Sequence, residues 1–170
     1  MRIFKEEQRF TKTWLIVLLA VSVMAPIAIT IKEYTAENST MTLKELLTTL
    51  LIVAISMSLI FLFKLKTRID EDGIHYRFFP FHFSLKKIAW SEIEKATTRK
   101  YNAISEFGGW GLKGGLFWKK SNGIAYNVTG DIGVQLKLTN GKKILIGTQK
   151  REEADRVLKN YEHKIIVNEN

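Results

Sequence analysis

The sequence contains no cysteine and only two prolines. Without cysteine the chain has no disulfide bonds, no thiolate nucleophile and no zinc site with Cys ligands. Charge is also missing from two long stretches, because no Asp, Glu, Lys, Arg or His occurs from Thr13 to Ile31 or from Leu46 to Phe63. The 107 residues of Lys64–Asn170 that follow are enough for one small domain, which excludes a large barrel or a doubly wound enzyme.

Both uncharged runs have the length of a membrane span, because a helix of 19 residues covers about 28 Å of a hydrocarbon core about 30 Å thick. The sequence therefore predicts a transmembrane helical hairpin over residues 1–63, with spans at about 13–31 and 46–63. The absence of ionisable side chains within the spans argues against a pump or proton relay. The alternative for the first run is a cleaved signal peptide, although its apolar stretch is longer than a typical signal core.

The orientation follows from the distribution of Lys and Arg. Four lie in the first 12 residues, and Lys64, Lys66 and Arg68 follow the second span, whereas the connecting Lys32–Glu45 loop holds only two. Positive residues mark the cytoplasmic side, so we expect a multi-pass protein of the plasma membrane with both termini in the cytoplasm.

After Lys64 the pattern changes to the period of two that is typical of strands. A turn at Glu71-Asp72-Gly73 separates the first two strands, and Asn140-Gly141 is a strong hairpin signal. Residues Glu92–Tyr101 form a further strand or a helical turn leading into one. The expected strands and strand-containing segments are Leu65–Ile69, Ile74–Phe78, Phe81–Leu85, the glycine-rich Glu106–Gly130, Ile132–Leu138 and Lys143–Gly147.

A C-terminal amphipathic helix completes the predicted domain. Thr148 is placed to cap it, with Glu152 and Glu153 in its first turn. The apolar stripe that packs on the sheet consists of Ala154, Val157, Leu158 and Tyr161. The predicted fold class is an α+β membrane protein, in which the helical hairpin of 1–63 precedes a mostly antiparallel β domain, 64–170, capped by one helix.

This layout resembles small bacterial membrane proteins that carry two transmembrane helices and a pleckstrin-homology-like (PH-like) domain. The segments that carry the resemblance are Ile69–Ile74, Ile88–Ile93, Glu106–Gly111, Ala125–Gly130, Gly133–Leu136 and Asn140–Gln149. The resemblance implies a PH-like barrel and a membrane-anchored binding or scaffolding module of the bacterial inner membrane, in a family of unknown function. It brings no catalytic residues with it.

Three weaker patterns have ordinary structural explanations. Gly109–Gly114 matches Gly-x-Gly-x-x-Gly, but a dinucleotide site needs this string between a strand and a helix, and no helical pattern follows. The three histidines have no companions at metal-ligand spacing, although His75 and His82 lie on neighbouring predicted strands and could meet. Glu92 and Glu94 read as a solvated acidic pair. We therefore expect no cofactor and no metal.

The basic residues carry more information. Lys64–Asn170 holds 20 Lys and Arg against 12 Asp and Glu, a net charge of +8 out of +9 for the chain. Such a domain favours an anionic neighbour, here lipid headgroups, whereas nucleic acid is not expected at a membrane. Scattered solubilising charge is the competing explanation. The candidate binding surface is Lys86, Lys87, Phe107, Trp110, Lys113, Phe117, Trp118, Lys119, Lys120, Lys142 and Lys143.

These features predict a non-catalytic module that binds anionic lipid, a protein partner or a second copy of the chain at the membrane. A membrane-tethered enzyme with its site in residues 106–130 is the first alternative, and an accessory subunit of a larger membrane complex is the second. The aromatic residues of 106–130 either form an interface or plug the core, and the sequence leaves both open.

Overall fold

The computed structural model describes residues 3–114 and 122–165, and it divides the chain into two compact units. One unit is the helical segment Phe10–Leu62. The other unit, which we call the sheet unit, combines Met1–Arg9 with Phe63–Asn170. Residues Phe4–Arg9, which precede the helices in the chain, belong with the sheets as a strand.

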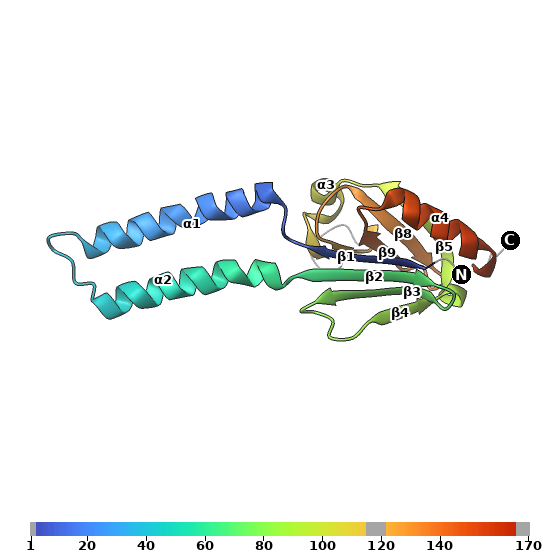
Figure 1. Cartoon of the computed structure of the whole chain (residues 1–170), viewed down its shortest axis with the longest axis horizontal. Helices are drawn as coiled ribbons and strands as arrows, with labels where there is room; N and C mark the ends of the chain where they lie inside the picture. Colours follow the sequence, from blue (N-terminus) through green and yellow to red (C-terminus); the bar gives the residue numbers. More distant parts are fainter. Residues whose placement is uncertain (1–2, 115–121, 166–170) are drawn as a thin grey trace. The chain divides into compact units, whose positions relative to one another are not determined.

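The helical unit consists of two antiparallel helices (Figure 1), α1 (Thr13–Tyr34) and α2 (Leu43–Ser58), the second continuing through a 3₁₀ turn to Leu62. Thr42 and Glu45 form a reciprocal capping box that starts α2. Both helices are long and apolar enough to cross a membrane, and Thr30 is their only buried residue. Hydroxyls at Thr48, Ser56 and Ser58 donate to carbonyls one turn back, so they are satisfied within the helix.

The first sheet has four antiparallel strands in the order β1-β2-β3-β4 (Figure 1). Their bounds are β1 Phe4–Arg9, β2 Lys64–Asp70, β3 Gly73–Phe79 and β4 Lys86–Ala89. Strand β1 was not predicted. It pairs with β2 along its whole length, from Phe4 opposite Ile69 to Arg9 opposite Lys64. The two apolar helices are therefore an insertion between two hydrogen-bonded neighbouring strands.

Charged side chains match β1 to its partner. Glu7 lies opposite Lys66, and Lys64 Nζ approaches Glu7 Oε1 at 2.7 Å. The Lys64 ammonium is the largest influence that lowers the pKa of Glu7, to about 2. On the inward face Phe4 is fully buried, and Gln8 Nε2 donates to the Gly147 carbonyl at 2.8 Å. Cleavage of the first helix as a signal peptide would remove this strand from the sheet, which argues against that alternative.

The third predicted strand, Phe81–Leu85, is wrong. Residues after Phe79 form turns and bends, and the third strand in the chain after Lys64 is β4, starting at Lys86. Phe81 and Phe83 alternate as in a strand, but both are exposed while His82 between them is buried. Pro80 has no amide hydrogen for a ladder bond, so the regular pairing stops before it.

The second sheet has five strands in the order β5-β8-β9-β7-β6. The bounds are β5 Ile93–Lys100, β6 Gly111–Gly114, β7 Ile124–Asn127, β8 Ile132–Leu138 and β9 Lys143–Gly147, and a 3₁₀ turn at Trp90–Glu92 precedes β5. The predictions for Glu92–Tyr101, for β8 and β9, and for short strands within 106–130 are confirmed. The described strands form two sheets and no closed barrel, because β4 ends after four residues and the chain passes to the other sheet without pairing to β5.

Helix α4 (Arg151–Tyr161) packs on strands of both sheets. Its predicted stripe of Ala154, Val157, Leu158 and Tyr161 is buried, as expected. Thr148 is not the N-cap residue, a position held by Lys150. The Thr148 hydroxyl instead donates to Glu6 Oε2 at 2.6 Å, while Glu6 Oε1 accepts from the Gln149 amide at 2.9 Å. Strand β1 thus also secures the entry to α4.

Candidate functional site

The candidate site is the surface around a short helix, α3 (Ala103–Phe107), between β5 and β6. Asn102 caps the helix, since its side-chain oxygen accepts from the amides of Ile104 at 3.1 Å and Ser105 at 2.9 Å. Gly108 ends it in the left-handed conformation. Helix α3 was not predicted, because five residues are too few to show a helical period. Its sequence signal is the capping residue Asn102 followed by Gly108.

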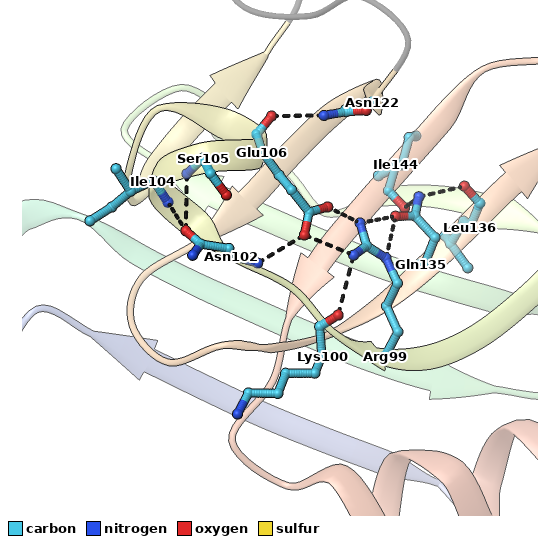
Figure 2. Close-up of polar contacts among 10 residues, drawn as sticks. All are labelled: Arg99, Lys100, Asn102, Ile104, Ser105, Glu106, Asn122, Gln135, Leu136 and Ile144. Carbon is cyan, nitrogen blue, oxygen red and sulfur yellow. Dashed lines mark hydrogen bonds and ion pairs between the residues drawn. The ribbon is translucent and has the colours of Figure 1, made fainter.

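An ion-pair network fixes α3 to the second sheet, and Figure 2 shows its members. The Arg99 guanidinium forms a two-pronged pair with Glu106, with Nη2 at 2.7 Å from Oε2 and Nη1 at 3.2 Å from Oε1. Gln135 Oε1 on β8 accepts from Arg99 Nη2 at 3.0 Å, and Glu106 Oε1 accepts from the Asn102 amide at 2.9 Å. The planar geometry makes this a specific positioning contact.

The same network determines the chemistry of Glu106. The Arg99 guanidinium holds the pKa of Glu106 below its usual range. The carboxylate is therefore ionised at neutral pH, and its oxygens are already engaged by protein donors. A general acid needs a raised pKa and a free path to substrate, so Glu106 is a structural anchor for α3.

An open hollow of about 480 Å³ lies beside this helix. Its apolar part includes Ile104, which is 63% exposed, and Trp110. Its polar rim includes Lys100 and Asp131, which form an ion pair at 3.1 Å. The hollow thus combines an exposed apolar side chain with a solvent-exposed ion pair on its rim, an arrangement also found on protein-binding surfaces. Ile104 was not among the predicted residues.

The structure separates the predicted aromatic residues. Phe107 is 1% exposed and packs with Tyr101, Ala125 and Leu145, so it is a core residue and not part of a binding surface. Trp110 is partly buried against this cluster, and its indole Nε1 donates to the Gly130 carbonyl at 3.0 Å. Trp110 therefore forms one wall of the hollow while it helps to close the core.

The glycines of the glycine-rich segment Glu106–Gly130 have a structural role. A Cβ on Gly114 would lie 2.2 Å from the Gly123 carbonyl oxygen, and one on Gly123 would lie 2.1 Å from the Lys143 carbonyl oxygen. Only glycine allows these backbones to approach so closely. Within Gly109–Gly114 the last four residues form strand β6, which is not the strand-to-helix turn of a dinucleotide site.

The predicted basic residues are divided between the two sheets. Lys86 and Lys87 are exposed on β4 of the first sheet, and Lys142 and Lys143 are exposed at the β8–β9 turn of the second. Lys113 is half-buried on β6. Phe117, Trp118, Lys119 and Lys120 lie outside the described residues.

The histidines do not assemble a site. His75 Nε2 lies 3.1 Å from Asp70 Oδ1, whereas the His82 ring packs against Tyr76 and Tyr126 at centroid distances of 5.7 and 5.3 Å. Within residues 3–114 and 122–165, no three His, Asp or Glu side chains gather as metal ligands would.

The burial of His82 predicts a loss of stability in acid. Burial, with Lys86 nearby, lowers the pKa of His82 below its usual 6.5. Below about pH 6.5, His82 therefore binds a proton more readily in the unfolded chain than in the folded chain. The contribution of neutral His82 to the free energy of unfolding is complete above pH 6.5 and falls as the pH drops towards the lowered pKa. Urea unfolding in detergent at about pH 7.5 and 5.5 measures it. In His82→Gln the pH dependence should shrink, and an identical dependence in that variant would contradict the assignment.

No protein-family model matches this chain, and no curated protein matches it in sequence. The features of this chain that bear on function are the paired strands β1 and β2, between which the helices are inserted, and the hollow beside α3.

Proposed function

We propose that this protein is a non-catalytic binding module anchored in the plasma membrane, the inner membrane of a bacterium, by α1 and α2. In this proposal a PH-like sheet unit stands at the cytoplasmic face and offers its basic surface and the hollow beside α3 to anionic lipid or a protein partner. The observation that carries the proposal is the insertion of two apolar helices between β1 and β2. Because β1 and β2 are hydrogen-bonded, an even number of crossings is required.

The charge of the sheet unit supports the cytoplasmic side. Arg9 and Lys64 flank the two helices in the chain and face each other in the sheet. Positive residues at both membrane-entry points fit the anionic inner leaflet.

The shape of the hollow supports binding over catalysis. Ile104 is exposed on α3. Asn102 caps the N-terminus of this helix, and the Arg99–Glu106 ion pair attaches it to the second sheet. An exposed apolar side chain on a helix whose backbone is already held loses little entropy when a partner covers it. We assign Ile104 and Trp110 as the centre of the partner-binding surface.

Single-cysteine labelling tests the proposal cleanly, because the natural chain has no cysteine. In intact cells an impermeant maleimide should label Ser39→Cys, in the α1–α2 connection, but label Ile104→Cys and Asn140→Cys only after lysis. In native membranes Ile104→Cys should react more slowly than in purified protein, while the exposed turn control Asn140→Cys reacts equally in both.

Two results would contradict the proposal. Labelling of Asn140→Cys from outside would place the sheet unit on the other side of the membrane. Equal rates for Ile104→Cys in native membranes and in purified protein would show that nothing covers α3, and the module would then have no partner at this surface.

A further inference from the structure

Three exposed apolar side chains of the sheet unit lie close together in sequence in the β3–β4 loop, Pro80–Leu85. Phe83 is 81% exposed, Phe81 is 55% exposed and Leu85 is 49% exposed. Water-facing phenyl groups grouped in one short loop are unfavourable for a soluble surface and often mark an interface.

The strand register places this loop at one particular end of the first sheet. Arg9, the last residue of β1, lies opposite Lys64, the first residue of β2, and Lys64 lies opposite Phe79, the last residue of β3. The chain therefore leaves for α1, returns from α2 and enters the loop at the same end of the sheet (Figure 1).

Contacts between aromatic rings show how close the loop lies to the end of the apolar helical segment. Phe63 directly follows Leu62, the last residue of the apolar helical segment. The centroid of its ring lies 6.0 Å from the ring of Phe81 and 5.9 Å from that of Phe78. Phe81 is thus within one side chain of the point at which the apolar segment ends.

The fold holds these side chains outward. The His82 amide donates to the Phe78 carbonyl at 2.8 Å, and the Phe78 amide donates to His82 Nδ1 at 3.3 Å, which anchors the middle of the loop inward. Arg77 donates to the Phe83 carbonyl at 3.3 Å. With His82 buried, its two neighbours Phe81 and Phe83 are presented to the outside.

We propose that Phe81, Phe83 and Leu85 insert into the interfacial layer of the same membrane that α1 and α2 cross. This inference rests on the proposed membrane anchoring. The occupant is lipid because the loop begins where the apolar helical segment ends, and because Lys86 and Lys87, exposed directly after it, suit anionic headgroups. The loop is a third attachment that stops the sheet unit from swinging away from the bilayer.

Depth-dependent quenching in the full chain tests the inference. Single-cysteine proteins carrying an environment-sensitive fluorophore are reconstituted in vesicles of phosphatidylcholine and phosphatidylglycerol that contain spin-labelled lipid. We expect the label on Phe83→Cys to lose most of its emission to a shallow quencher. A label on Met24→Cys, within α1, should be quenched by a deep quencher, and one on Asn140→Cys should keep its emission.

A second variant tests whether quenching is caused by the phenyl groups of the loop or by the attached fluorophore. With the reporter at Leu85→Cys, replacement of Phe81 and Phe83 by Ser should abolish the quenching, because the loop then has no apolar anchors. If it persists, the anchors are not these residues.

The failures are distinguishable. Quenching at Met24→Cys without quenching at Phe83→Cys overturns the loop inference and leaves membrane anchoring in place. Absence of quenching at Met24→Cys overturns both. Disulfide-linked dimers of unlabelled Phe83→Cys, together with no lipid quenching of the labelled protein, show that a second copy, and not lipid, covers the loop.

Discussion

The sheet unit will fold without its helices when an Asn-Gly turn joins Arg9 to Lys64, but Lys64–Asn170 alone will not reach the same stability. Arg9 and Lys64 are directly opposite in an antiparallel pair, so a two-residue Asn-Gly turn closes β1 and β2 into an ordinary hairpin. Lys64–Asn170 lacks β1 and therefore loses fully buried Phe4, the Gln8 bond to Gly147 and the Glu6 contacts at α4.

Thermal unfolding followed by circular dichroism measures the difference. Phe4→Ala in the joined protein should reduce the free energy of unfolding by about 3–5 kcal/mol, the usual cost of removing a buried phenyl group. Lys5→Ala on the outward face of the same strand is the control and should change it by less than about 0.5 kcal/mol. If Lys64–Asn170 melts like the joined protein, β1 adds nothing and its place in the sheet is wrong.

Leu158→Asp will unfold most of the sheet unit in the full chain. Leu158 is 5% exposed within the α4 stripe, and the adjacent Tyr161 ring stacks on Trp90 at 5.4 Å. A carboxylate buried there would be desolvated without a partner. The resulting loss of several kcal/mol in the free energy of unfolding is comparable with a total stability of about 5–15 kcal/mol.

The measurement is the urea midpoint of the full chain in mild detergent, with tryptophan emission as the signal. Asn160→Asp, which adds the same charge to an exposed position of α4, is the control and should keep the parent midpoint. An unchanged midpoint for Leu158→Asp would mean that α4 does not dock on the sheets.

Strong local patterns account for the parts of the fold that the sequence predicted. The α4 stripe, strand β8 and the Asn140-Gly141 turn each have their full signal within a few neighbouring residues. Strand β1 has no such signal, because four of its six residues are charged and its partners lie far along the chain, with Phe4 opposite Ile69. Buried Phe4, the Gln8 bond to Gly147 and the cross-strand pairs hold it in place, and only the assembled sheet brings these contacts together.

The candidate site also combines features with a local sequence signal and features that only the folded chain brings together. The segment containing Trp110 was predicted as the place to look, but a sequence does not say which aromatic side chain faces inward, and Phe107 is a core residue. Arg99, Glu106 and Gln135 meet from β5, α3 and β8, so no spacing along the chain relates them. No sequence pattern distinguishes Ile104 from other isoleucines. Its exposure on a capped helix appears only in the structure.

The position of α1 and α2 between β1 and β2 also sets the order of biosynthesis. Strand β1 leaves the ribosome first and waits for β2 through the synthesis of both helices, a delay of seconds at about 5–20 residues per second. Its many charges keep it soluble as an unpaired edge during that time. In the proposed membrane topology, a chain that inserted only one helix would leave β1 and β2 on opposite sides of the bilayer. In that topology the sheet can be completed only after both helices have been inserted.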